Sequence, residues 1–210
     1  ERLELAEFDL LGLPPIDPAD YSGVFVAGSP YGTARGYVSA SEQRVRDELT
    51  ALLTQLIDAG EPVLATGSAA GILAGLLGFE PSAEHGEVGD VTDIELTREA
   101  MQDPVFAALP PVFPAYVNYP EAAGSLPETA VRLARSLNTP VQAFQTAGNV
   151  YGIQFSPELD AELMQTKIEA FADAGDTGIG DTESLVTAGR YSDGSHQAGR
   201  VIAAFARHFA

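Results

Sequence analysis

The chain contains no cysteine and no tryptophan among its 210 residues. It can therefore form no disulfide, hold no thiolate-bound metal and use no thiol as a nucleophile. Its three histidines, His85, His196 and His208, are scattered, and no two of them have the spacing of a metal-binding pair. The sequence predicts neither a metal site nor a cofactor.

Positive charge is scarce as well. The chain has 11 basic against 30 acidic residues, which gives a net charge of −19. Such a surface repels phosphate backbones and anionic membranes, so we expect neither nucleic acid nor membrane among the partners. The acidity is typical of a highly soluble protein, for example one in a salty cytoplasm.

Long apolar runs are absent too, and none approaches the ~20 residues that span a bilayer. No segment resembles a signal peptide, so we expect a cytoplasmic protein. Hydrophobic residues make up 45% of the chain, enough for a core in one domain of ordinary size. We therefore predict a single domain over residues 1–210.

Two apolar segments in the first half predict strands that are buried on both faces of a sheet. They are Tyr21–Ala27 and Pro62–Ala65. Between them, Ser39–Glu42 has the spacing of a capping box and opens an amphipathic helix that Gly60 ends. Because strands and helices alternate, the sequence predicts an α/β fold with a doubly wound, mostly parallel sheet.

The middle of the chain, Pro81–Gln145, has a different pattern. Its short alternating segments predict an antiparallel extension of the parallel sheet, and Pro104–Pro114 is expected to be an irregular connection. The expected strands are Asp93–Leu96, Ala130–Ser136, Val141–Gln145 and Val150–Phe155.

The segment Glu61–Phe79 predicts a strand that turns sharply into an apolar helix. Such a turn is where many α/β enzymes hold a nucleophile, because the helix N-terminus offers free N–H groups and a positive dipole end. A catalyst would place cysteine or serine at the apex. Here the small residues are Thr66, Gly67, Ser68 and Ala69.

Four segments carry a family resemblance: DYSGVFVAGSP (Asp20–Pro30), PVLATGSAAGILAGLLG (Pro62–Gly78), LPETAVRLARSLNTPVQAF (Leu126–Phe144) and NVYGIQFSPELD (Asn149–Asp160). Together they resemble the class I glutamine amidotransferase domain, the glutaminase half of enzymes such as GMP synthase. The resemblance covers most of the chain, from Asp20 to Asp160, and is nearest to the stand-alone GMP-synthase-like amidotransferases. It implies a flavodoxin-like fold in which one more strand and helix precede Glu1, so we expect an N-terminal segment to be missing.

In that family a cysteine attacks the glutamine carboxamide, a histidine takes the thiol proton, and a glutamate orients the histidine. The resemblance puts these positions at Gly67, Ser156 and Glu158. Glycine has no side chain with which to attack, and serine is no base near neutral pH. The resemblance therefore implies a triad that has lost its nucleophile and its base.

The resemblance also implies ligand-binding positions. Gly28 and the Ser68 N–H match the oxyanion-hole elements, and Tyr119 stands where relatives carry histidine. Two interpretations of Ser68 are open, a replacement nucleophile or the cap of its helix. Two interpretations of Glu158 are open as well, a relic of the triad or a cap for the helix expected from about Asp160.

These observations leave several functions open. The first is a pseudoenzyme that binds a small amide-like ligand or a protein partner, such as a synthase-type subunit, without hydrolysing glutamine. The second is an active hydrolase that uses Ser68. The third is an inactivated form of a glutamine-hydrolysing amidotransferase. Whether the chain is an enzyme is therefore left open by its family resemblance, although we expect it to lack glutaminase activity.

Overall fold

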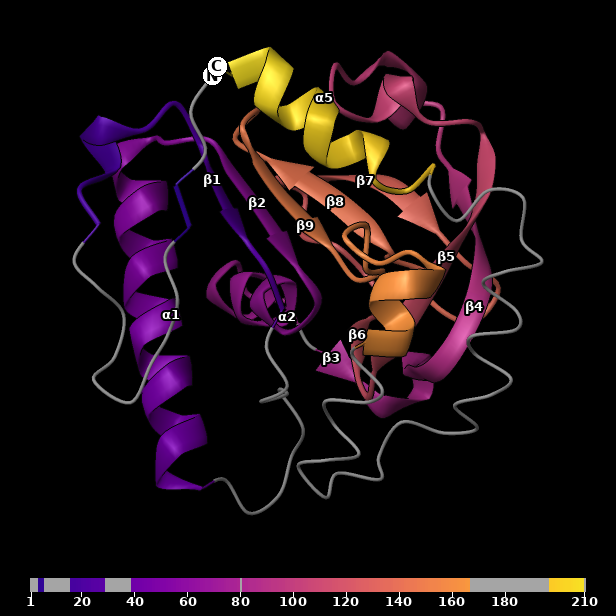
Figure 1. The fold of residues 1–210 in the computed structure, drawn as a ribbon, viewed down its shortest axis with the longest axis horizontal. Coiled ribbons are helices and arrows are strands. Elements are labelled where there is room, and N and C mark those ends of the chain that lie inside the picture. The colour runs from indigo at the N-terminus through magenta and orange to yellow at the C-terminus, as the bar shows by residue number, and fades with distance from the viewer. Residues whose placement is uncertain (1–3, 6–15, 29–38, 80, 167–196, 210) are drawn as a thin grey trace.

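A computed structural model describes residues 4–5, 16–28, 39–79, 81–166 and 197–209, and the statements below concern these residues. Seven strands form one sheet in the order β1-β2-β9-β8-β7-β4-β5, with helices on both faces (Figure 1). The sheet strands are β1 Val24–Val26, β2 Val63–Thr66, β4 Glu87–Leu96, β5 Val112–Tyr119, β7 Ala130–Arg135, β8 Ala143–Thr146 and β9 Val150–Ile153. The helices are α1 Ala40–Ala59, α2 Gly67–Leu76 and α5 Arg200–Phe209. Shorter elements are η1 Pro18–Asp20, β3 Pro81–Ser82, η2 Ala83–His85, η3 Ala100–Gln102, η4 Phe106–Ala108 and β6 Ala122–Ala123, with β3 and β6 paired.

The strand β2 is buried on both faces, as its continuous apolar pattern predicts. Val63 and Ala65 pack in the core cluster under α1 and α2, whereas Leu64 packs in the cluster that includes α5. The α/β architecture with two covered faces is thus confirmed.

Only part of the sheet is parallel. β1, β2 and β9 run parallel, but every pair from β9 to β5 is antiparallel, so the expectation of a mostly parallel sheet is not confirmed. For β8 and β9 the reason is a short connection, because a parallel crossover needs a dozen or more residues. The turn from β8 to β9 is the clearest case, with positive φ at Ala147 and Gly148.

Helix α1 follows its sequence signals closely. The Ser39 hydroxyl accepts the Glu42 N–H, and the Glu42 carboxylate accepts the Ser39 N–H, which completes the capping box. This arrangement lowers the pKa of Glu42, because the backbone and side chain of Ser39 donate to its charged form. Gly60 ends the helix with φ of 73°.

The strand β5 was not expected from the sequence. It begins inside the stretch predicted to be an irregular connection, and Pro114 lies within it. Proline lacks the N–H that a central strand needs, but β5 is the last strand in the order and tolerates it. β4 is likewise longer than the predicted strand Asp93–Leu96.

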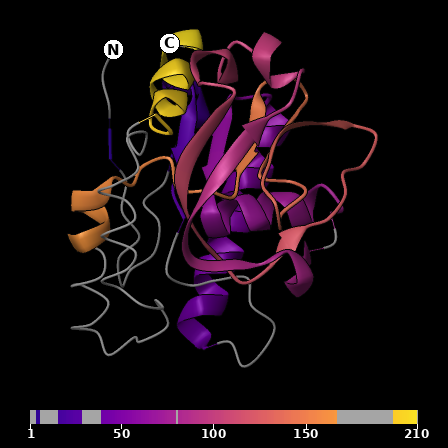
Figure 2. The same ribbon diagram turned by 90° about the vertical axis from the view of Figure 1, so that its right-hand side faces the viewer.

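The sheet is strongly curled. Ser156 follows β9, yet its N–H donates to the Tyr116 carbonyl of β5 at 2.9 Å, although β5 is last in the strand order. In Figure 2, β4 and β5 sweep across the front of the molecule. The curl brings the end of β5 toward the carboxyl ends of the parallel strands. None of the described helices is long and apolar enough to cross a membrane.

Candidate functional site

The three parallel strands end at the same edge of the sheet, and each is followed by a predicted site residue. Val26 of β1 pairs with Ala65 of β2, and Thr66 of β2 pairs with Ile153 of β9. Gly28, Gly67 and Ser156 follow these strands in turn. Open α/β sheets bind their ligands at this edge, so the register supports the predicted location of the site.

The turn from β2 to α2 has no connecting residue, because α2 begins at Gly67 directly after Thr66. Gly67 has φ of +54°, in the left-handed region that side chains rarely adopt. A Cβ added there would meet one atom within 4 Å, the Gly28 Cα at 3.5 Å, which is ordinary van der Waals contact. The apex therefore has room for a side chain, although it carries none.

Gly28 packs directly on this turn. A Cβ on Gly28 would lie 3.2 Å from the Thr66 carbonyl oxygen and 3.3 Å from the Ser68 nitrogen. The Gly28 N–H donates to the Thr66 hydroxyl at 3.3 Å. One of the two predicted oxyanion donors is therefore already engaged by a neighbouring side chain.

Ser68 is the second residue of α2 and is half-buried. The N-cap position belongs to Thr66, so the alternative in which Ser68 caps the helix is wrong. The helix starts two residues earlier than that alternative requires, at Gly67 rather than at Ala69.

Ser156 is buried, with 9% of its surface exposed, and it begins the turn that contains Glu158. The helix beyond this turn begins at 161, and its side-chain cap comes from Asp160, which accepts the N–H groups of Glu162 and Leu163. Asp160 thus fills the capping role that one alternative gave to Glu158.

Tyr119 lies in a buried polar cluster on the antiparallel half of the sheet, and we call this the Glu87 cluster. The Tyr119 hydroxyl donates to the Glu87 carboxylate, which also accepts from Gln142 Nε2 at 2.8 Å. Burial raises the pKa of Tyr119 well above its usual 10, and the bond to Glu87 raises it further. Tyr119 is therefore a neutral donor. The members of the cluster are Glu87, Tyr119, Ser136, Thr139 and Gln142.

The structure thus brings Gly28, Gly67 and Ser68 into contact and puts Ser156 after the adjacent strand β9. Tyr119 is instead held by the Glu87 cluster. Sequence reasoning missed this cluster because its members lie in separate short segments, and no local spacing links them.

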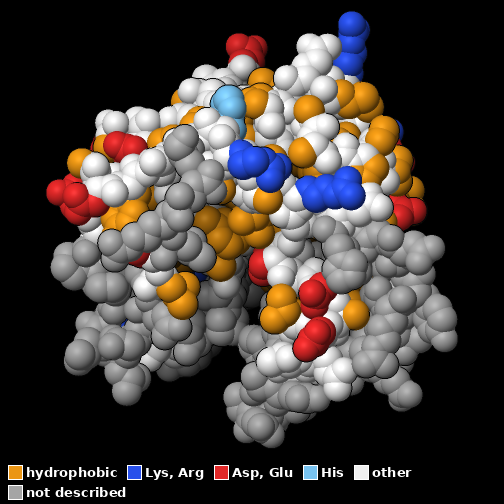
Figure 3. All heavy atoms as spheres, turned by 45° about the horizontal axis from the view of Figure 1, so that its top comes forward, with side chains coloured by type: hydrophobic (Ala, Val, Ile, Leu, Met, Phe, Trp, Pro, Cys, Tyr) orange, Lys and Arg blue, Asp and Glu red, His pale blue; other side chains and the backbone are white. Residues whose placement is uncertain are grey.

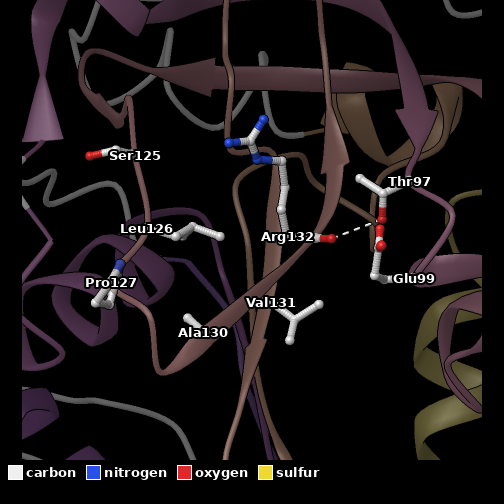
Figure 4. A pocket seen from close by; sticks show the side chains of 8 residues that line it. All are labelled: Thr97, Glu99, Ser125, Leu126, Pro127, Ala130, Val131 and Arg132. Carbon is white, nitrogen blue, oxygen red and sulfur yellow. Dashed lines mark hydrogen bonds between the residues drawn. The ribbon is translucent and has the colours of Figure 1, made fainter.

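A surface hollow of about 460 Å³ lies elsewhere, on the antiparallel half of the sheet. Figure 4 shows the Arg132 side chain pointing away from Ala130 and Val131, while the Thr97 hydroxyl donates to the Arg132 carbonyl at 2.8 Å. No predicted site residue lines it. Its lining residues are Thr97, Glu99, Ser125, Leu126, Pro127, Ala130, Val131 and Arg132.

Comparison with known proteins gives matches in structure and none in sequence. No family model matches, and no curated protein matches. A glutamine amidotransferase from Thermotoga maritima superimposes with a TM-score of 0.71 at 21% identity, over 91% of this chain and 79% of that one. A glutamine amidotransferase from Methylobacillus flagellatus superimposes with a TM-score of 0.60 at 17% identity, over 92% of this chain and 81% of that one.

A Thermoplasma acidophilum protein that is assigned to GMP synthase gives a TM-score of 0.57 at 18% identity, over 92% of this chain and 78% of that one. These likenesses extend over nearly the whole chain, so they concern the entire arrangement of strands and helices. The chain has the fold of the glutamine amidotransferases.

Proposed function

We propose that this chain is a non-hydrolysing member of the amidotransferase fold, which binds a small amide-like ligand or a synthase-type protein partner without releasing ammonia. The observation that carries this proposal is Gly67, a residue without a side chain at the left-handed apex of the β2–α2 turn. The backbone suits a nucleophile, and the chain contains no cysteine to supply one.

The second lost group is the base. Ser156 stands where the resemblance expects histidine, and its hydroxyl cannot accept a proton near neutral pH. Nucleophile and base act as one unit in such mechanisms, and the loss of either removes most of the rate. The two substitutions together favour binding over turnover.

Ligand binding is supported on physical grounds. The N-terminus of α2 is the positive end of the helix dipole, and the N–H groups of a first helical turn are not used by the helix itself. A carboxamide oxygen is a suitable acceptor at such a terminus. The protein-partner alternative is supported by the likeness to the Thermoplasma protein that is assigned to GMP synthase.

The first experiment measures ammonia from the pure protein with glutamine, and glutamine binding by calorimetry. We expect no turnover. A rate of roughly 1 per second or more, ordinary for enzymes, would contradict the proposal. A fluorophosphonate probe tests the alternative nucleophile, and stoichiometric labelling that Ser68→Ala abolishes would favour a serine hydrolase.

Restoring the triad is the sharper experiment. Gly67→Cys should alkylate with iodoacetamide, because the helix dipole lowers the thiol pKa somewhat from about 8.5, but it should release little ammonia. Adding Ser156→His supplies a base two residues before Glu158. The double variant should therefore release ammonia from glutamine far faster than either single variant. A residue other than glycine in the left-handed backbone at position 67 lowers the stability of the fold by roughly 1–3 kcal/mol. Each variant is therefore first shown to be folded by circular dichroism.

The single and double variants also separate the remaining alternatives. A folded double variant with strong turnover would mean that the chain is an inactivated form of a glutamine-hydrolysing protein. A folded double variant no better than Gly67→Cys would mean that Ser156 is not the base position or that the glutamine pocket is closed.

A further inference from the structure

The charge of this chain is far out of balance, and the imbalance is not relieved by lysine. The net charge is −19, and Lys167 is the only lysine in the sequence. A compact state with so much charge of one sign repels itself. The question is therefore where the carboxylates lie and what neutralises them.

Most of the described carboxylates face solvent. Two of them, Glu87 and Asp103, are buried, and both are held by hydrogen bonds from neutral donors. The Asp103 carboxylate accepts the N–H groups of Val105 and Phe106. The exposed acidic residues include Glu4, Asp17, Asp20, Asp47, Asp58, Glu84, Asp93, Glu95, Glu99, Glu128 and Glu162.

In the described part of the chain, two arginines pair with glutamates at the surface. Arg135 pairs with Glu95 at 2.7 Å and Arg44 with Glu48 at 3.7 Å, and all four side chains are substantially exposed. Exposed pairs of this kind contribute little to stability. Figure 3 shows the face that carries α5, where arginine side chains (blue) gather among apolar ones and carboxylates (red) lie around them.

Like charges also meet at unfavourable places. Asp58 lies in the last turn of α1, which contains no basic residue, and Glu61 follows the helix directly. Both add to the negative end of the helix dipole. On β4, Asp93 and Glu95 are two residues apart on one exposed face, roughly 7 Å from each other by strand geometry, and Arg135 pairs with Glu95.

From this distribution we infer that the folded state depends on dissolved salt, and that the chain reaches full stability only at high ionic strength. The Debye length is ~10 Å at 0.1 M salt and ~3 Å at 1 M. Repulsion across ~7 Å therefore persists in dilute buffer and is screened near 1 M. Salt here acts on the whole acidic surface and needs no specific ion site.

The experiment is thermal unfolding by circular dichroism from 0.05 to 2 M KCl. We expect the midpoint to rise by roughly 10 °C or more, with most of the rise below 1 M. NaCl should give the same curve. Potassium sulfate at matched ionic strength separates screening from the general salting-out effect of sulfate. Equal midpoints at 0.05 and 2 M KCl would overturn the inference, as would a rise seen with sulfate alone.

A pair of variants tests the cause. The first neutralises four surface carboxylates: Asp58→Asn, Glu61→Gln, Glu84→Gln and Asp93→Asn. The matched control keeps the charge with Asp58→Glu, Glu61→Asp, Glu84→Asp and Asp93→Glu. The neutralised variant should unfold at a higher temperature in 0.05 M KCl and depend less on salt, whereas the control should behave like the parent. Equal salt dependence in both variants would contradict the surface-repulsion cause.

Discussion

Two regions of this molecule differ in the kind of residue that forms them. The candidate site at the ends of β1, β2 and β9 consists of glycine, serine and backbone atoms, with Gly28 packed against the turn at Gly67. The Glu87 cluster contains a carboxylate, a phenol, two hydroxyls and an amide, and each member bonds to another. The groups that could do chemistry are therefore engaged in holding the structure together.

The physical reason is the cost of burial. A buried carboxylate is tolerated only when hydrogen-bond donors replace its water. Glu87 begins β4, Tyr119 ends β5, and Ser136, Thr139 and Gln142 belong to the segment from the end of β7 to the start of β8. The cluster joins these segments, so its role is to fix the antiparallel half of the sheet.

The largest expected effect comes from breaking the cluster. Glu87→Leu leaves the buried donors of Tyr119, Ser136 and Gln142 without their acceptor, and we expect a loss of roughly 3 kcal/mol or more in the free energy of unfolding. Ser156→Ala at the candidate site is the comparison, and it should change the free energy of unfolding by less than about 1 kcal/mol. Urea unfolding of both variants measures the difference. Similar losses would mean that the two regions do not differ in this way.

A smaller effect should follow at the close contact between Gly28 and the β2–α2 turn. Gly28→Ala puts a Cβ 3.2 Å from the Thr66 carbonyl oxygen, which cannot move without moving β2. We expect a loss of about 1–2 kcal/mol in the free energy of unfolding. Gly75→Ala in α2, where a Cβ would meet nothing within 4 Å, is the control and should be neutral or stabilising. Equal stability of the two variants would show that the turn is not tightly packed.

The smallest effect is a dependence on alkaline pH. Burial raises the pKa of Tyr119 and also that of Tyr151, which bonds to Asp103. Above pH ~10 tyrosine ionises in the unfolded chain but not at these two sites, so the folded state is the one that holds more protons and stability falls as pH rises. At pH ~10.5 the free energy of unfolding should be lower than at pH ~9 by roughly 1 kcal/mol for each of these two tyrosines.

Tyr119→Phe should therefore make the fall between pH ~9 and ~10.5 shallower, because it removes one of the two buried phenols. Tyr151→Phe removes the other buried phenol and should make the fall shallower as well. Chemical unfolding at several pH values in constant, concentrated KCl measures both slopes. Identical slopes in the parent and in Tyr119→Phe would contradict a neutral, buried Tyr119.

The sequence by itself determined the elements whose signals lie within a few residues. The capping box at Ser39 and the glycine at position 60 set the ends of α1, and its inward leucines follow helical spacing. The same holds for the turn from β2 into α2. The lack of cysteine also excludes thiol chemistry whatever the fold, because no other side chain supplies a thiol.

Only the tertiary structure decided the features that join distant segments. Pro114 argues against a strand locally, but an edge position accepts it. Ser156 meets Tyr116 because the sheet curls, and Glu87 meets Tyr119 and Gln142 across 32 and 55 residues of sequence. Local patterns record capping, turns and the periodicity of buried faces. Bonds between buried polar groups depend on how strands far apart in the chain are brought together, and no short pattern encodes that.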